Sequence, residues 1–192
     1  MALAARRALG HADVARKDDS CAWGRLMAVF ETRAREASNP LDRVERLAHA
    51  HDWFFDRAGD DEVTMIIAAA WSDLHLSLNW REDVESLHVA CSFDQKIPAS
   101  RREEIGRLLG LVNEQLYFGH FDVWREDGSI LFRNSLILAG GAEANEAQCE
   151  SLIRIAIEAC ERYFPSLQFV MWAGKTAEEA IASSLLETVG EA

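Results

Sequence analysis

Residues 87–138 read as a strand, a helix and a β-hairpin, and this order constrains the fold more than any other stretch of the chain. In residues 87–93 apolar side chains alternate with polar ones, which is typical of a strand with one buried face. In residues 105–116 apolar side chains recur at three- and four-residue spacing, which predicts an amphipathic helix. Asp127-Gly128 then separates two alternating segments and predicts a hairpin turn.

A two-residue turn at Asp127-Gly128 would set the register of the hairpin. It places Val123 opposite Phe132 and Asp122 opposite Arg133. The second pair would be a cross-strand ion pair worth about 0.2–1 kcal/mol. We expect this pair to stabilise the sheet, and the alternative is an anion-binding role for Arg133.

Two more strands are expected before this stretch, at residues 63–71 and 74–80, where apolar and polar side chains again alternate. A four-residue connection at 81–84 would pair Leu76 with Val89. The alternation gives the sheet one apolar and one polar face, as expected where helices cover a single side. The sequence therefore predicts an α+β fold, an antiparallel β-sheet with helices packed on one face.

Polar residues mark where the helices begin. Three starts carry capping signals, namely Asn39-Pro40, Ser100 with Glu103, and Thr176 with Glu179. Asn145 can cap a further helix, which we expect to end before Pro165. The six tryptophans include Trp71 and Trp80, which fit the apolar faces of their strands and are expected in the core.

The chain has 192 residues, enough for one well-buried domain with an extension. We expect residues 1–38 to be an N-terminal extension, partly mobile, and residues 39–192 to be the α+β domain. The extension carries seven basic and five acidic side chains, so with a total of −12 the rest holds about −14. A domain with this negative charge repels phosphate backbones and anionic lipid, which argues against nucleic acid or a membrane as partner. With no apolar run near the ~18 residues of a membrane span, we expect a cytoplasmic protein.

The four cysteines are Cys21, Cys91, Cys149 and Cys160, and their spacing is not that of a metal site. We expect them to be reduced and buried as small apolar side chains, with no metal and no cofactor. Gly174-Lys175-Thr176 matches the end of a phosphate loop, but Phe169 stands where that loop needs its first glycine. We interpret this stretch as a helix break and cap.

Two sets of side chains on the hairpin are candidates for binding. Trp124, Leu131 and Ile137 share one side of it, and they would form a partner or dimer surface if exposed. If a terminal helix covers them, they form a small second core instead.

The alternative site is a small-molecule pocket between sheet and helices around Arg133, His120 and Asn134. His120 is expected opposite Ser135, which resembles a base beside a hydroxyl. The only acid evident on that face is Asp122, which the ion pair already engages, so we expect no catalytic triad and no enzyme.

Several segments carry a resemblance to one family: 39–45, 80–82, 91–94, Pro98, 113–121, Asp127-Gly128, 132–133, 169–172 and 174–175. Over about residues 39–192 the chain resembles the YbjN domain family, described as putative bacterial sensory transduction regulators. This resemblance implies a fold similar to that of type III secretion chaperones, which are typically dimeric binding proteins without cofactors. It implies no catalytic residues.

These observations favour a non-catalytic cytoplasmic regulatory or chaperone-like protein that binds an unidentified protein partner as a homodimer. The alternative is a small-molecule sensor or enzyme with its pocket around Arg133. A third hypothesis makes residues 1–38 the tether to a partner, with the acidic domain as its regulator.

Overall fold

The computed structural model describes residues 39–189, and residues 184–189 by their backbone alone. Six strands form one antiparallel sheet in the spatial order β1 (Phe54–Arg57), β2 (Glu62–Ala68), β3 (Asp73–Arg81), β4 (Ser86–Lys96), β6 (Ser129–Ile137) and β5 (His120–Val123). The helices are α2 (Pro40–Ala50), α3 (Arg102–Asn113), α4 (Glu146–Met171) and α5 (Ala177–Val189), with short 3₁₀ turns η1 (Glu82–Val84) and η2 (Ala99–Arg101). The expected extension and Cys21 lie outside the described residues.

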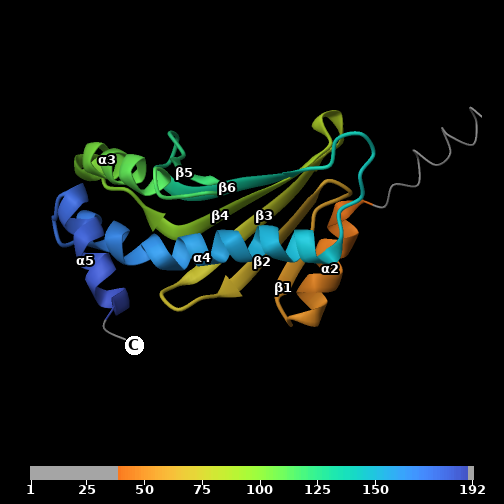
Figure 1. Ribbon diagram of the computed structural model, residues 1–192, viewed down its shortest axis with the longest axis horizontal. Helices are drawn as coiled ribbons and strands as arrows, with labels where there is room; N and C mark the ends of the chain where they lie inside the picture. Colours follow the sequence, from red (N-terminus) through yellow and green to blue (C-terminus); the bar gives the residue numbers. More distant parts are fainter. Residues whose placement is uncertain (1–38, 190–192) are drawn as a thin grey trace, which may run out of the picture. The chain divides into compact units, whose positions relative to one another are not determined.

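α4 crosses one face of the sheet, with α2 on the same face, and α3 and α5 pack near one end of α4 (Figure 1). Side chains on that face are buried at every second position over most of β2, β3 and β4, because successive residues of a strand point to opposite faces. Cys91 on β4 meets Cys160 on α4 there, with the two sulfur atoms 3.5 Å apart. The predicted α+β fold, with an antiparallel sheet covered on one face, is therefore confirmed.

Both predicted strand registers are wrong by two residues. Leu76 pairs with Cys91 instead of Val89, and Val123 pairs with Ile130 instead of Phe132. The hairpin connection is longer than two residues, since Trp124 still pairs with Ser129 and Gly128 adopts a φ of +78° before the return strand. A slip of two keeps each side chain on its predicted face, so the division into an apolar and a polar face survives.

Three of the predicted helix caps are present, and one is not. Asn39 and Asn145 accept from the first turns of α2 and α4, and Thr176 and Glu179 form a reciprocal capping box before α5. Ser100 instead lies inside η2, so the predicted box at α3 is wrong.

Pro165 does not end α4, which continues to Met171. A proline removes one hydrogen bond from a helix interior. Beyond it, Leu167 and Val170 are buried in the core, and this packing stabilises the last turns.

Trp71 was predicted to lie in the core and does not, because β2 ends at Ala68 and leaves the side chain 57% exposed.

The other sequence signals lie where expected. Cys91, Cys149 and Cys160 are free and buried. Lys175 donates to Ser183 Oγ at 2.7 Å and lies over the ring of Phe169, in the break between α4 and α5. None of the helices described between residues 39 and 189 has the length and apolar character needed to cross a membrane.

Candidate functional site

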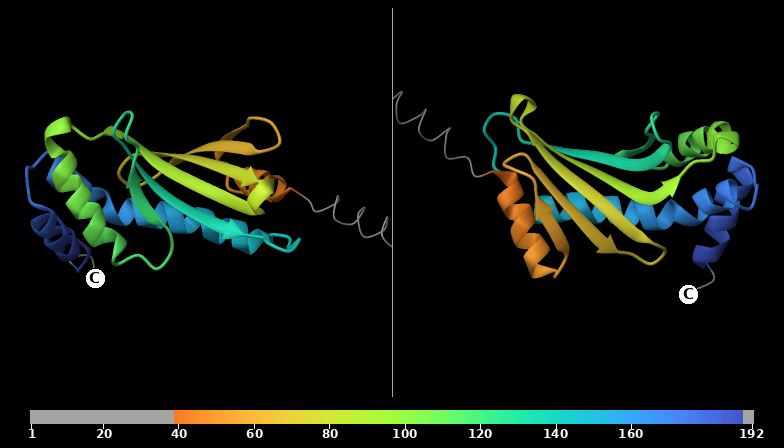
Figure 2. Two further views of the ribbon diagram at one scale, coloured as in Figure 1. Left: turned by 90° about the horizontal axis from the view of Figure 1, so that it is seen from above. Right: turned by 180° about the vertical axis from the view of Figure 1, so that it is seen from behind.

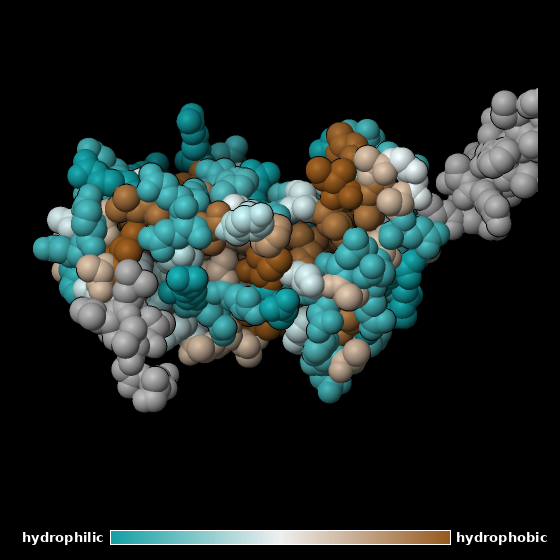
Figure 3. Space-filling view, viewed as in Figure 1, coloured by the Kyte–Doolittle hydropathy of each residue, from teal (hydrophilic) through white to brown (hydrophobic). Residues whose placement is uncertain are grey.

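A groove runs along α4, between this helix and the segment that connects α3 to β5. It consists of two hollows of about 340 and 440 Å³ that share Phe118 and Ile155. The apolar lining of this α4 groove is formed by Leu116, Tyr117, Phe118, Leu136, Leu152, Ile155 and Ala159. Figure 3 shows hydrophobic surface gathered among hydrophilic areas on the side of the molecule that carries α4.

The aromatic rim of the groove comes from the chain between α3 and β5. Asn113 ends α3 and ties it to β5, since its side chain donates to Phe121 O at 3.1 Å and accepts from Phe121 N at 2.8 Å. The residues between these two points bulge outward, and Tyr117 is 91% and Phe118 55% exposed. Their rings contact each other edge to face, with centroids 4.8 Å apart.

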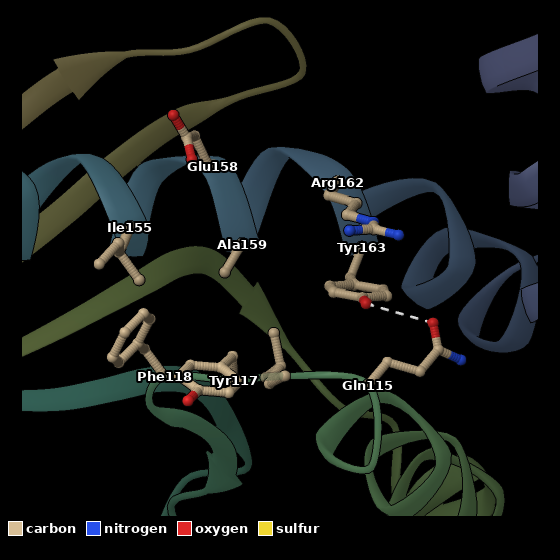
Figure 4. Close-up of a pocket in the computed structure, with 9 residues that line it drawn as sticks. Gln115, Tyr117, Phe118, Ile155, Glu158, Ala159, Arg162 and Tyr163 are labelled. Atoms are coloured by element: carbon tan, nitrogen blue, oxygen red, sulfur yellow. Dashed lines mark hydrogen bonds between the residues drawn. The ribbon is translucent and has the colours of Figure 1, made fainter.

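The opposite wall is one stripe of α4 (Figure 4). Ile155 and Ala159 face the aromatic rim, and Glu158 and Arg162 flank them toward solvent. At the far end Tyr163 OH donates to Gln115 Oε1 at 3.4 Å. An open apolar trough with charged rims is suited to burying another apolar surface, as at the centre of a protein interface.

The predicted partner surface does not form one patch. Trp124 is 50% exposed on the hairpin connection and Leu131 is half-buried nearby on β6. Ile137, 72% exposed, lies six residues beyond Leu131 on the same strand, which is roughly 20 Å at the rise of a β-strand. The structure therefore brings Trp124 and Leu131 together and leaves Ile137 apart, at the end of β6.

All three predicted ligand residues line one hollow of about 480 Å³. His120 pairs directly with Arg133, and both lie on the helix-free face. Asn134 follows on the strand and therefore points toward the helices. The hollow around Arg133 does not lie between the sheet and the helices as predicted, because strand alternation puts Arg133 on the helix-free face. His120 is opposite Arg133 and not Ser135, as the register slip requires.

Arg133 links two neighbours on the helix-free face. Its Nε donates to His88 Nε2 at 3.3 Å, and its Nη1 lies 3.6 Å from Asp122 Oδ2. The expected ion pair is thus present, although Asp122 now pairs with Leu131 and reaches Arg133 diagonally. Burial, with the charges of Arg133 and His120, lowers the pKa of His88 below its ordinary value of 6.5.

We expect the protein to lose stability in mild acid through His88. The unfolded chain binds a proton on this residue near pH 6.5, whereas the folded chain does so only at lower pH. The free energy of unfolding therefore falls as the pH drops from about 6.5 toward the folded-state pKa. Urea unfolding at about pH 7.5 and about pH 5.5 should show a smaller difference for His88→Asn than for the wild type.

His75→Asn is a matched control for that experiment, because His75 lies exposed on the same face. An unchanged pH difference in His88→Asn would contradict the assignment.

Together the sheet, the helices on one side of it and the open groove define a small α+β protein. The family model described as "YbjN: Putative bacterial sensory transduction regulator" matches residues 40–169. The chain belongs to this family, as the resemblance implied. The crystal structure of YbjN, a putative transcription regulator from E. coli, aligns with a TM-score of 0.46 and 9% identity, covering 63% of this chain and 85% of that one. No curated protein matches the sequence.

Sequence reasoning missed the groove. The predicted helix continues to Leu116, directly before Tyr117-Phe118, whereas α3 ends at Asn113. The available signal was two adjacent aromatic residues directly before a glycine. Neighbouring side chains at a helix end point in different directions, so both rings cannot be buried against the same core.

Proposed function

We propose that this protein is a non-catalytic cytoplasmic regulatory or chaperone-like domain that binds a protein partner through the α4 groove. One observation carries the proposal: Tyr117 and Phe118 are exposed together at the rim of an open apolar trough. Large aromatic side chains beside an apolar pocket are the usual anchors of protein interfaces. The family's description as a regulator supports the same interpretation.

A pull-down of the tagged full-length chain from its own cell lysate tests this proposal. We expect one stoichiometric protein partner with the wild type and its loss with Tyr117→Ser/Phe118→Ser. Trp172→Ser is the matched control, because Trp172 is an exposed aromatic residue at the other end of α4, outside the groove. Equal recovery with the groove variant would contradict the proposal, as would a retained metabolite without a protein partner.

We further propose that the protein acts as a homodimer and that Trp124 and Leu131 contribute a second contact surface. Support comes from an exposed indole beside an apolar neighbour on the helix-free face. Sedimentation equilibrium would distinguish a mass of one chain from a mass of two.

A small-molecule site around Arg133 is the second candidate function, favoured by the hollow over Arg133, His120 and His88. Arg133→Ala distinguishes the two. If the protein is a binding scaffold, the variant keeps its partner and loses at most about 1 kcal/mol, because exposed ion pairs contribute little. Loss of a retained metabolite in Arg133→Ala, seen by mass spectrometry, would favour the ligand site instead.

A further inference from the structure

We propose that the outer edge of β6 at Asn134–Ile137 takes an extended segment of the partner as an added strand. The proposal rests on the proposed function and names the form of partner that the α4 groove accepts.

The second half of β6 has no strand on its outer side (Figure 2, left). β5 pairs only with Ile130–Arg133. Leu138 N–H donates to Glu85 O at 2.7 Å, on the side of β4. Because backbone groups alternate along a strand, the odd-numbered residues of β6 point outward. The bond from Trp124 N–H to Ser129 O, 2.8 Å long, shows the same direction, because it reaches the odd-numbered Ser129 from the outer side of β6.

The outward backbone groups of the free segment are Ser135 and Ile137. Ser135 N–H is taken by the Asn134 side chain, at 2.9 Å from Oδ1. Ser135 C=O, and the N–H and C=O of Ile137, have no hydrogen-bond partner among residues 39–189. Such a row of edge groups is a template for another extended chain.

The α4 groove lies directly beside this edge. Leu136, on the helix-facing side of β6, lines the 440 Å³ hollow together with Leu152 and Ile155. In a strand added next to Leu136, every second side chain would point into that hollow. The backbone of the added strand would bond to the edge, and its apolar side chains would fill the groove.

The size of the slot favours a short extended peptide. At one end β5 begins with His120, and at the other the chain leaves the edge at Leu138, so four residues or roughly 13 Å are free. Two copies paired edge to edge would contact each other through these four residues only. The area buried would be well short of the ~800 Å² per partner of a stable interface. The charge of about −14 on residues 39–192 favours a segment with basic flanks.

Selection from a random decapeptide library displayed on phage, against the immobilised full-length protein, tests the inference. We expect binders with apolar residues at alternate positions. A synthetic binder should lose about tenfold or more in affinity for Ile137→Pro, the cost of one hydrogen bond or more, and stay within about twofold for Ile137→Thr. We expect the fold to tolerate proline here, because Ile137 N–H points away from β4.

A second measurement uses the unaltered protein, in case Ile137→Pro unfolds. The same peptide with N-methyl groups at alternate residues keeps its side chains but cannot donate to the edge, and it should not bind. No recovered binder, full binding of the methylated peptide, or equal affinity of a folded Ile137→Pro would overturn strand addition. A lysate partner lost with Tyr117→Ser/Phe118→Ser yet kept by folded Ile137→Pro would leave the groove function standing and reject strand addition alone.

Discussion

Replacing Phe132 with alanine is expected to lower the free energy of unfolding by about 3–5 kcal/mol. Phe132 is among the largest fully buried side chains of the protein. It pairs with Cys91 on β4 and with Phe121 on β5, and the two phenylalanine rings pack edge to face with centroids 5.3 Å apart. Removing the ring opens a cavity between the sheet and α4. Urea unfolding monitored by circular dichroism measures the loss.

Phe132→Leu is the matched control, because it retains most of the apolar volume and should cost clearly less. A loss below about 1 kcal/mol for Phe132→Ala would be that of an ordinary surface substitution and would contradict the burial of this ring.

Gly119→Ala should be the second most damaging change, at about 2–5 kcal/mol. Gly119 has a φ of +68°, and a Cβ there would lie 2.3 Å from Phe132 Cζ and 2.6 Å from Arg133 O. The ring can move, but the backbone oxygen belongs to β6 and cannot move without distorting the sheet. Thermal and urea unfolding both measure the effect.

Gly140→Ala separates the cost of the positive φ from the cost of the steric clash. Gly140 has a φ of +79°, and a Cβ added there would have no neighbouring atom within 4 Å, so this position bears the backbone strain without the clash. We expect about 1–2 kcal/mol for this control. If both variants lose the same stability, the close approach at Gly119 is not important.

The faces of the strands could be predicted from the sequence, but their registers could not. Alternation has a period of two, so the apolar and the polar face of β3 and β4 were predicted correctly although their pairing was not. The pairing depends on the length and the position of each connection, and here Glu85 and Gly128 adopt left-handed conformations within the turns. Their side chains gave no way to choose between connections that differ by two residues.

The groove could not be predicted because it depends on what α4 leaves uncovered. Ile155 belongs to the same apolar periodicity as the buried residues of α4, and the sequence does not show that one stripe faces an open trough. The free edge of β6 could not be predicted either. That β5 stops short of Asn134–Ile137 becomes evident only from the pairing in the sheet. Ile137 was a candidate for binding only if exposed, and it lies exposed at this edge.

Photo-crosslinking in living cells tests the central claim most directly, namely that the α4 groove contacts a protein partner. A photoreactive phenylalanine analogue would replace Phe118 in the full-length protein, with position 172 as the exposed aromatic control and position 124 for the other surface. We expect a discrete crosslinked adduct from position 118 and none from position 172. Adducts from position 124 alone, or none from position 118, would contradict it.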